Sequence, residues 1–337
     1  MKGNADRRPE RRLEGCRVLI TGGLGFIGSN LAHRCLELGA QVTIYDCLDP
    51  RSGGNMQNLH GIEDDVRVVL NDIRNFDGVC ACIRKQDVVF HCAAYTSHPN
   101  SMREPLIDVD VNCKGTLHVL EALRRFNKEA KTIYVGTSTQ IGRMHRSPID
   151  EAHGEFPLDI YSANKTAAEK YVLVYGAAYG MRCAAIRLAN TYGPRSNIRS
   201  AEFGFVNYFI GLALQNKDLS VFGDGGQQRN INYVGDAVEA MMLAATNEAA
   251  NGQTLFAVGD RQCTVREIAE AIVRNIGGRI HSVPWPRDRE AIEVGDAVIS
   301  NAKIKSVLDW SPATDLDAGL RLTKDYFVPH LKAYLEG

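Results

Sequence analysis

Short apolar runs alternate with amphipathic stretches along residues 16–190 of the chain. The runs are rich in Val, Ile and other apolar residues and have strand length, which predicts buried parallel strands. The stretches between them repeat apolar positions every three or four residues, as helices do. The predicted strands are CRVLIT (16–21), QVTIYD (41–46), VRVVLND (66–72), DVVFHCAA (87–94), KTIYVGTS (131–138) and MRCAAIRLAN (181–190), and the predicted helices are SNLAHRCLELG (29–39), GTLHVLEALRRF (115–126) and NKTAAEKYVLVYGAAYG (164–180).

The regular alternation ends after Asn190, where Gly/Pro-rich and aromatic segments begin, among them TYGPRSN, VFGDGGQQ and VPWPRDRE. Alternating strands and helices predict an α/β fold, with a doubly wound parallel sheet of Rossmann-like type and a smaller C-terminal part that binds substrate. The expected division is a disordered tail over 1–14, a Rossmann domain over 15–190 that is completed by about 230–258, and a substrate-binding part formed by 191–229 and 259–337.

The composition narrows the class of protein. The 39 basic and 40 acidic side chains leave a net charge of −1, so no broad field favours nucleic acid or anionic lipid. No apolar run approaches the roughly 18 residues of a membrane span, and the start lacks the apolar segment of a signal peptide. Among nine cysteines, the close pair Cys80 and Cys82 has the wrong spacing for a zinc site. We therefore expect a cytoplasmic protein with reduced thiols, without a metal, nucleic-acid or membrane partner.

A glycine-rich turn joins the first strand to the first helix. Gly22, Gly25 and Gly28 are spaced three apart, which lets the backbone turn tightly and approach a pyrophosphate at the helix N-terminus. Asp46 ends the next strand, 18 residues after Gly28. A carboxylate there can accept hydrogen bonds from both adenosine ribose hydroxyls and repels a 2′-phosphate, which favours NAD over NADP. A plain turn residue before Asp49 is the alternative for Asp46.

Three types of side chain indicate a reaction at a hydroxyl group. Tyr161 and Lys165 stand four apart on a predicted helix and therefore share one face. A nearby cation can lower the pKa of a phenol and hold its oxygen near a reacting group. The strand KTIYVGTST ends in the hydroxyls of Thr137, Ser138 and Thr139, at the edge of the sheet where ligands bind. Without that strand, a Tyr and Lys at this spacing would be unremarkable.

An ordered set of motifs spans most of the chain: TGGLGFIG, Asp46, NDI at 71–73, HCAA, Asn112, GTST, YSANK and RLANTYGPR. This set resembles the extended short-chain dehydrogenase/reductase family, which contains NAD-dependent epimerases and dehydratases of nucleotide sugars. The resemblance covers about residues 16–325. It implies a nucleotide-sugar substrate and a homodimer.

The resemblance also implies a role for each matching residue. Tyr161 would be the acid/base, Thr137 the active-site hydroxyl, and Lys165 the group that binds the nicotinamide ribose and tunes the tyrosine. The residues expected to bind NAD are Gly22, Gly25, Phe26, Ile27, Gly28, Asp46, Asp72, Ile73, Ala93, Ala94, Tyr95, Asn112, Tyr161 and Lys165. The residues expected to bind the nucleotide sugar are Ser101, Thr137, Ser138, Thr139, Asn190, Val206, Val221, Arg229 and Arg287.

Two departures from the family pattern affect these expectations. Relatives usually continue the arginine of the GDGxQxR element with an Asp and an aromatic residue, whereas this chain has Asn230 and Ile231 after Arg229. Arg229 itself is present, so its role with the substrate phosphates, where guanidinium groups bind bidentately, is retained. The segment after Thr139 reads Gln140-Ile141-Gly142 instead of the usual Val-Tyr-Gly.

The reaction follows from the groups around Tyr161. As a phenolate it would take a proton from a sugar hydroxyl, usually at C4, while hydride moves to NAD. In the family that this chain resembles, dehydratases and decarboxylases usually carry a carboxylate just after the active-site hydroxyl. This chain has Ser138 and Thr139 at those positions. A 4-epimerase that passes through a 4-keto intermediate is therefore predicted. A dehydratase or decarboxylase with His98 or another residue as proton shuttle, and a non-catalytic dinucleotide-binding protein, are the alternatives.

Overall fold

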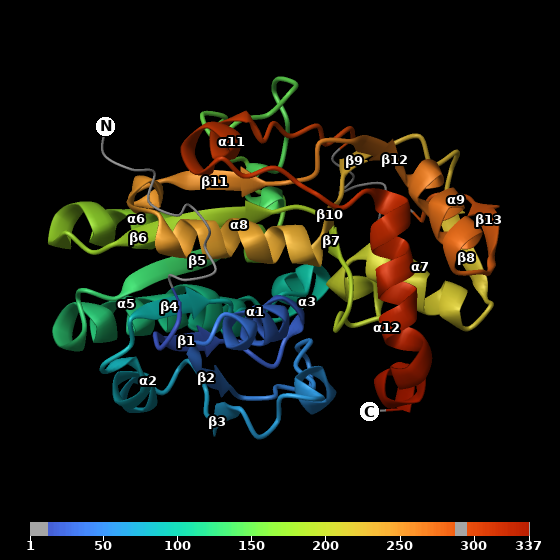
Figure 1. The fold of residues 1–337 in the computed structure, drawn as a ribbon. Coiled ribbons are helices and arrows are strands. Elements are labelled where there is room, and N and C mark those ends of the chain that lie inside the picture. Colours follow the sequence, from blue (N-terminus) through green and yellow to red (C-terminus); the bar gives the residue numbers. More distant parts are fainter. Residues whose placement is uncertain (1–12, 287–294, 337) are drawn as a thin grey trace, which may run out of the picture.

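The computed structural model describes residues 13–286 and 295–336. A seven-stranded sheet lies at its centre, with the strand order β11-β6-β5-β4-β1-β2-β3 (Figure 1). Every neighbouring pair in this sheet is parallel. The direction of winding reverses between β1 and β4, which is where open sheets of this type leave a crevice. The strands are β1 (Arg17–Thr21), β2 (Gln41–Asp46), β3 (Val66–Leu70), β4 (Val88–His91), β5 (Lys131–Thr137), β6 (Cys183–Leu188) and β11 (Thr254–Ala257).

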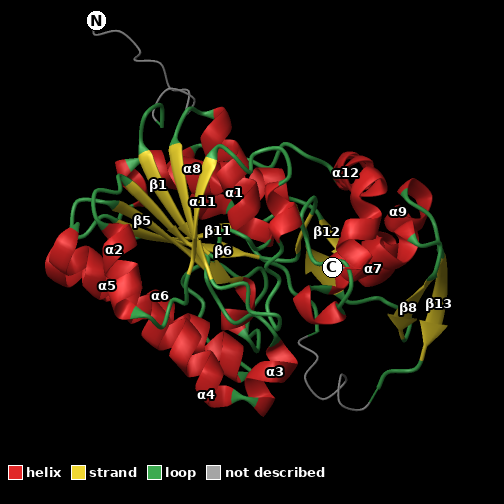
Figure 2. Cartoon of the chain, turned by 90° about the horizontal axis from the view of Figure 1, so that it is seen from below, coloured by secondary structure: helices red, strands yellow, loops and turns green. Residues whose placement is uncertain are grey.

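Helices cover both faces of the sheet, and this explains the composition of its central strands. All residues of β4 and β6 are buried, so both strands read as continuous largely apolar runs. Figure 2 shows the two helical layers on opposite sides of the strands. One layer contains α1 (Phe26–Glu37), α8 (Val234–Thr246) and α11 (Ala302–Leu308), and the other contains α2 (Phe76–Ile83), α5 (Gly115–Phe126) and α6 (Ile160–Tyr179).

A smaller part, mostly C-terminal in sequence, lies beside the carboxyl edge of the sheet (Figure 1). Its own apolar core is formed largely by α7, α9, β8 and the start of α12. Its helices are α7 (Phe205–Leu214), α9 (Val265–Asn275) and α12 (Leu316–Glu336), and its strand pairs are β8 (Asp218–Phe222) with β13 (Arg279–Val283), β9 (Gln228–Asn230) with β12 (Gln262–Thr264), and β7 (Thr191–Tyr192) with β10 (Asn232–Tyr233).

Short helical segments follow several strands and shape the edge of the sheet. A π-helix, η3 (Val109–Lys114), leads directly into α5, and such segments are frequent near functional sites. The remaining short elements are η2 (Met56–Leu59), α3 (His98–Arg103), α4 (Pro105–Asp108), η4 (Ser138–Ile141), η5 (Ala201–Phe203) and η6 (Glu248–Ala250).

The fold class predicted from the sequence is confirmed. Each of the six predicted strands is present; β2 has the predicted bounds, and the other five are shorter than predicted. The last strand of the sheet, β11, comes from residues 254–257 and pairs with β6. Two parts of the expected division differ from the structure. Residues 302–308 form α11, which packs on the central sheet and not with the C-terminal part. Leu13, assigned to a disordered tail, is 1% exposed and packs into the core beside Val18 and Leu38, because burial of its apolar side chain stabilises it there.

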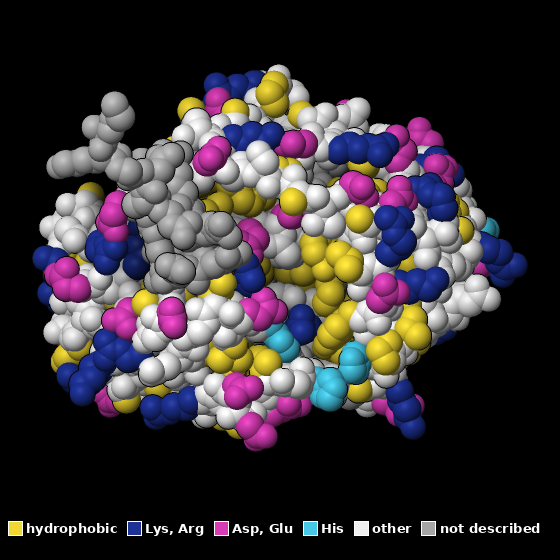
Figure 3. All heavy atoms as spheres, in the orientation of Figure 1, with side chains coloured by type: hydrophobic (Ala, Val, Ile, Leu, Met, Phe, Trp, Pro, Cys, Tyr) yellow, Lys and Arg dark blue, Asp and Glu magenta, His cyan; other side chains and the backbone are white. Residues whose placement is uncertain are grey.

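Within the described residues, no helix has the length and apolar character that a bilayer span requires. On the face shown in Figure 3, Lys and Arg side chains are interspersed with Asp and Glu, without a large area of one sign. This distribution agrees with the near-balance of charge in the sequence. A charged ligand must therefore be held by local groups.

Candidate active site

A cavity of about 420 Å³ opens at the carboxyl edge of the sheet. The residues that line it follow β1, β2, β3, β4, β5 and β6, and further lining residues come from η5 and α7. Parallel strands place their carboxyl ends at one edge, so segments far apart in sequence meet here. Many residues expected to bind cofactor or substrate contribute to the lining: Gly22, Gly25, Phe26, Ile27, Gly28, Asp46, Asp72, Ile73, Ala93, Ala94, Tyr95, Thr137, Thr139, Tyr161, Lys165 and Asn190.

The glycine-rich turn at the start of α1 has no room for a side chain at Gly22 or Gly28. Gly22 has a φ of +69°, and a Cβ there would lie 2.6 Å from the backbone nitrogen of Ala93. A Cβ on Gly28 would lie 2.3 Å from the carbonyl oxygen of Gly22. Gly25 is the N-cap of α1 and offers no side chain to the first N–H groups of the helix. Those donors, at the positive end of the helix, suit the pyrophosphate of a dinucleotide.

Asp46 ends β2 and lines the cavity beside this turn. Its carboxylate accepts hydrogen bonds from the backbone nitrogens of Leu24 at 3.0 Å and Leu48 at 2.9 Å, which fix its orientation. Burial raises the pKa of Asp46, while the backbone hydrogen bonds oppose that shift. A cation that would suit a 2′-phosphate is already engaged, because Arg74 donates two hydrogen bonds to Asp72 at 2.9 and 2.6 Å. The site therefore fits an unphosphorylated ribose.

Asn112 supports the cavity without lining it. Its Oδ1 accepts a hydrogen bond from the backbone nitrogen of Tyr95 at 3.0 Å, and its Nδ2 donates to the carbonyl oxygen of Tyr95 at 2.9 Å. Asn112 lies in the π-helix and is fully buried. This pair of bonds holds the segment after β4 against the start of α5, which positions Ala93 and Ala94 at the cavity wall.

Tyr161 and Lys165 project from the first turns of α6 into the cavity beside Thr137. Nζ of Lys165 donates a hydrogen bond to the carbonyl oxygen of Val135 at 2.7 Å and lies 4.2 Å from the ring centroid of Tyr134. Burial lowers the pKa of Lys165 to about 8. Burial raises the pKa of Tyr161 well above its usual value, and the charges of nearby carboxylates add to this, while a hydrogen bond with Thr137 opposes the shift.

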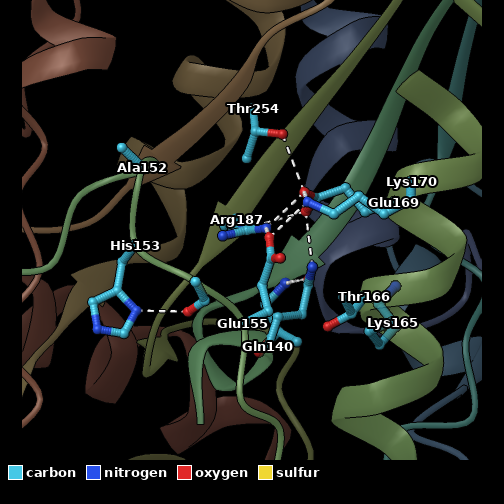
Figure 4. A network of polar contacts seen from close by, with 12 residues as sticks. Gln140, Ala152, His153, Glu155, Lys165, Thr166, Glu169, Lys170, Arg187 and Thr254 are labelled. Carbon is cyan, nitrogen blue, oxygen red and sulfur yellow. Dashed lines mark hydrogen bonds and ion pairs between the residues drawn. The ribbon is translucent and has the colours of Figure 1, made fainter. Parts of the chain in front are cut away.

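A buried polar network holds the segment that carries Thr137 (Figure 4). The side chain of Gln140 accepts a hydrogen bond from the backbone nitrogen of Thr137 at 2.8 Å and donates one to Glu169 at 2.9 Å. Glu169 in turn accepts two hydrogen bonds from Arg187, at 2.8 and 2.7 Å, and both residues are almost fully buried. The unusual Gln140 thus ties the end of β5 to α6 and β6.

The hydroxyls after β5 do not all face the cavity. Oγ1 of Thr139 lies 3.1 Å from Oγ1 of Thr137 and accepts a hydrogen bond from Ser162 at 3.0 Å. Thr139 lines the cavity, but Ser138 does not. Asn190 does line it, with a φ of +32°, and its Nδ2 donates to the carbonyl oxygen of Asn230 at 2.9 Å.

Besides Ser138, four residues expected to bind substrate do not line the cavity. Val206 and Val221 are buried in the apolar core of the C-terminal part, since α7 and β8 turn these side chains inward. Ser101 is fully buried and donates a hydrogen bond to the carbonyl oxygen of His98 at 2.8 Å. Arg229 donates hydrogen bonds to the carbonyl oxygens of Gln228 and Gly295, at 2.8 and 2.6 Å. Arg287 lies outside the described residues.

The sequence did not identify a hydrogen-bonded pair at the cavity wall, formed by His98 and Asp159. His98, at the start of α3, lines the cavity and donates a hydrogen bond from Nδ1 to Oδ2 of Asp159 at 2.8 Å. Asp159 is the N-cap of α6, two residues before Tyr161. An Asp just before a helical pattern is a recognisable N-cap signal, but nothing in the sequence links it to His98, 61 residues away.

A comparison with protein families matches residues 18–259 to the NAD dependent epimerase/dehydratase family. A putative UDP-glucose 4-epimerase of Methanocaldococcus jannaschii is 32% identical over 307 residues, covering 90% of this chain and 96% of that protein. A UDP-N-acetyl-alpha-D-glucosaminuronate decarboxylase of Bacillus cytotoxicus is 30% identical over 322 residues, covering 92% of this chain and 97% of that protein.

Solved structures with the same fold include two UDP-glucose 4-epimerases. The enzyme of Thermus thermophilus, solved in complex with NAD, aligns with a TM-score of 0.82 at 30% identity, over 92% of this chain and 98% of that chain. The enzyme of Thermotoga maritima, solved with UDP-glucose, aligns with a TM-score of 0.84 at 28% identity, over 94% of this chain and 99% of that chain.

Proposed function

The chain belongs to the NAD dependent epimerase/dehydratase family, and on this premise we propose that it is an NAD-dependent 4-epimerase of a nucleotide sugar. One observation carries the proposal. Thr137, Tyr161 and Lys165 meet in one cavity, while the two positions after Thr137 hold hydroxyls instead of a carboxylate. Oxidation and reduction at one carbon need no second acid. Relatives that catalyse elimination or decarboxylation carry a carboxylate at one of these two positions.

The residues of the cavity fit NAD. The glycines of the turn leave room for a pyrophosphate, and Asp46 presents a fixed carboxylate to the ribose hydroxyls. When bound, NAD supplies a hydride acceptor and the positive charge of its oxidised nicotinamide ring. That charge matters for Tyr161, because burial and the charges of nearby carboxylates raise the pKa of its phenol.

The side chains of this protein handle the proton and orient the sugar. Tyr161 accepts the proton of the C4 hydroxyl as the bond to the hydroxyl hydrogen breaks, and it returns that proton when the C4 ketone is reduced. Thr137 hydrogen-bonds to the same oxygen and steadies it. Lys165, held by the carbonyl oxygen of Val135, binds the cofactor ribose and favours the phenolate.

The phosphates of the nucleotide sugar need donors at the other end of the cavity. We assign this task to Asn190, which lines the cavity. We also assign it to Arg229, which does not itself line the cavity but belongs to β9, the strand joined to Asn190 by the hydrogen bond to Asn230. Arg287 is assigned the same task on the sequence motif alone.

Incubation of the purified protein with UDP-, GDP-, CDP- and dTDP-sugars tests the proposal, with products identified by mass spectrometry and NMR. We expect one of these sugars to be converted to its C4 epimer with no change in mass and no net consumption of NAD. A product lighter than the substrate by one water would indicate a dehydratase, and one lighter by one carbon dioxide would indicate a decarboxylase. Either result would contradict the proposed epimerase. Failure to convert any sugar, with the protein loaded with NAD, would contradict the proposal.

A further inference from the structure

His98 and Asp159 form a hydrogen-bonded pair at the wall of the cavity. Nδ1 of His98 lies 2.8 Å from Oδ2 of Asp159, and the ring of His98 packs edge-on against the ring of Tyr161 with centroids 4.8 Å apart. Burial acts to raise the pKa of Asp159, but its hydrogen bonds with His98 and with Ser162 hold that pKa below its usual value. Asp159 is therefore an anionic acceptor for His98.

The carboxylate of Asp159 decides which nitrogen of His98 is available. A carboxylate only accepts hydrogen bonds, so Nδ1 carries the proton and Nε2 of the neutral ring has a free lone pair. Within residues 13–286 and 295–336, Nε2 forms no hydrogen bond, and about a third of the side chain, 35%, stays exposed in the cavity. An imidazole with a carboxylate behind one nitrogen and an open second nitrogen is arranged as a general base.

Both members of the pair are held in place by hydrogen bonds of their own. Oδ1 of Asp159 accepts a hydrogen bond from the backbone nitrogen of Ser162 at 2.7 Å. The carbonyl oxygen of His98 accepts the hydrogen bond from buried Ser101. Ser97 and Asn100, on either side, donate to Glu202 of η5 at 3.1 and 3.2 Å. The imidazole is thus fixed between α3, α6 and η5.

Tyr161 already serves the C4 hydroxyl in the proposed function, so this pair is a second proton acceptor in the same cavity. Once C4 is a ketone, the hydrogens on its neighbours C3 and C5 become acidic. We propose that His98 and Asp159 are a second acid/base pair, which removes and returns a proton at a sugar carbon next to the transient ketone. The inference rests on the proposed function, because that function forms the ketone.

The proposed step is balanced without a further reactant. The C–H bond breaks, a bond from the proton to Nε2 forms, and the electron pair moves onto the ketone oxygen to give an enolate. Thr137 and Tyr161 hydrogen-bond to that oxygen, and Asp159 balances the positive imidazolium. Return of a proton from Nε2 to carbon restores the ketone. In heavy water the returned proton is replaced by deuterium.

The first experiment follows conversion of the accepted nucleotide sugar in D₂O by proton NMR. The wild type should place deuterium at C3 or C5 of the product and of the recovered substrate, while C4 keeps its original hydrogen. In His98→Gln the ratio of exchange to epimerisation should fall by at least about tenfold. Asp159→Asn should reduce the same ratio while keeping the helix cap, since Asn caps as well as Asp.

The matched control is His60→Gln, which makes the same substitution at an exposed histidine outside the cavity. It should exchange and epimerise as the wild type does. Epimerisation by the wild type with no deuterium at C3 or C5 would overturn the inference and leave the proposed function intact. Equal exchange ratios in the wild type and His98→Gln would also overturn it.

A second experiment does not depend on the oxidation step. The NAD-loaded protein is mixed in D₂O with UDP-4-keto-6-deoxyglucose, and separately with the dTDP form, so that the ketone is supplied directly. The rate of hydrogen exchange at C3 or C5 should be at least about tenfold higher with the wild type than in buffer without protein. It should exceed the rate with His98→Gln by a similar factor. If the wild type exchanges hydrogen only at the buffer rate with both ketones, His98 and Asp159 are not an acid/base pair for this step. This conclusion holds whether or not the incubation with nucleotide sugars reveals an epimerase.

Discussion

Tyr161 and Lys165 share the cavity but contribute differently to the proposed reaction. Tyr161 is buried beside Thr137, and its phenol oxygen is the only atom that Tyr161→Phe removes. We expect turnover in this variant to fall by ~10²- to 10⁴-fold, as is typical when a general base is lost. NAD affinity and the midpoint of urea unfolding should stay near those of the wild type, because other groups form the cofactor site.

Lys165→Ala is the companion variant, since it removes the ammonium group held by Val135. It should slow turnover and also weaken NAD binding, measured by calorimetry on the apoprotein. The two variants should therefore differ in pattern. Turnover near the wild-type rate in Tyr161→Phe would rule out the phenol as the base.

Asp46 determines the expected preference for NAD. Asp46 lines the cavity, and its carboxylate is fixed by two backbone hydrogen bonds. Asp46→Ala removes both the ribose acceptor and the repulsion of a 2′-phosphate. The dissociation constant of NADP, divided by that of NAD, should therefore fall toward one in this variant. Equal affinity of the wild type for the two cofactors would contradict this role.

At the scale of elements, the network around Arg187 joins β5, β6 and α6. Arg187 is 1% exposed and donates two hydrogen bonds to Glu169, which is 0% exposed. Glu169→Ala would leave the guanidinium buried with Glu155 as its remaining ion-pair partner. We expect a loss of ~3 to 5 kcal/mol in the free energy of unfolding, the usual cost of breaking a buried pair.

The adjacent Lys170 provides a control for this measurement. Its side chain is 47% exposed, and it pairs with Glu155 at 2.7 Å and, more distantly, with Glu169 at 3.9 Å. Lys170→Ala should change the free energy of unfolding by at most about 1 kcal/mol. Similar unfolding curves for Glu169→Ala and the wild type would show that the network does not stabilise the contact between α6 and the sheet.

At the scale of the whole molecule, the family resemblance predicts a homodimer. Exposed apolar side chains on neighbouring segments agree with this, since Leu106 of α4 is 77% exposed and Val174 of α6 is 57% exposed. Light scattering after gel filtration should give about twice the chain mass of 37.1 kDa. Leu106→Glu should shift the population toward the monomer, because charge is costly in an apolar interface.

An exposed apolar residue elsewhere supplies the comparison. Leu70, at the end of the edge strand β3, is 62% exposed. Leu70→Glu should leave the measured mass unchanged. A monomeric wild type at micromolar concentration would contradict the prediction.

The sequence by itself determined six strands of the sheet, three of the helices that cover it and the glycine turn. These features depend on local rules: apolar runs mark buried strands, a repeat of about 3.6 marks helices, and glycine is required where a Cβ would meet backbone, as at Gly28. Tyr161 and Lys165 also follow from local spacing, since residues four apart share a helix face.

Tertiary structure alone decided which of the remaining residues meet. His98 and Asp159 are 61 positions apart, and only the docking of α3 against α6 joins them. Val206 and Val221 matched family positions, yet the packing of α7 and β8 turns both into an apolar core, while Asn112 reaches the backbone of Tyr95 and not the cavity. The orientation of a side chain depends on the neighbours that surround it, and those neighbours come from distant segments of the chain.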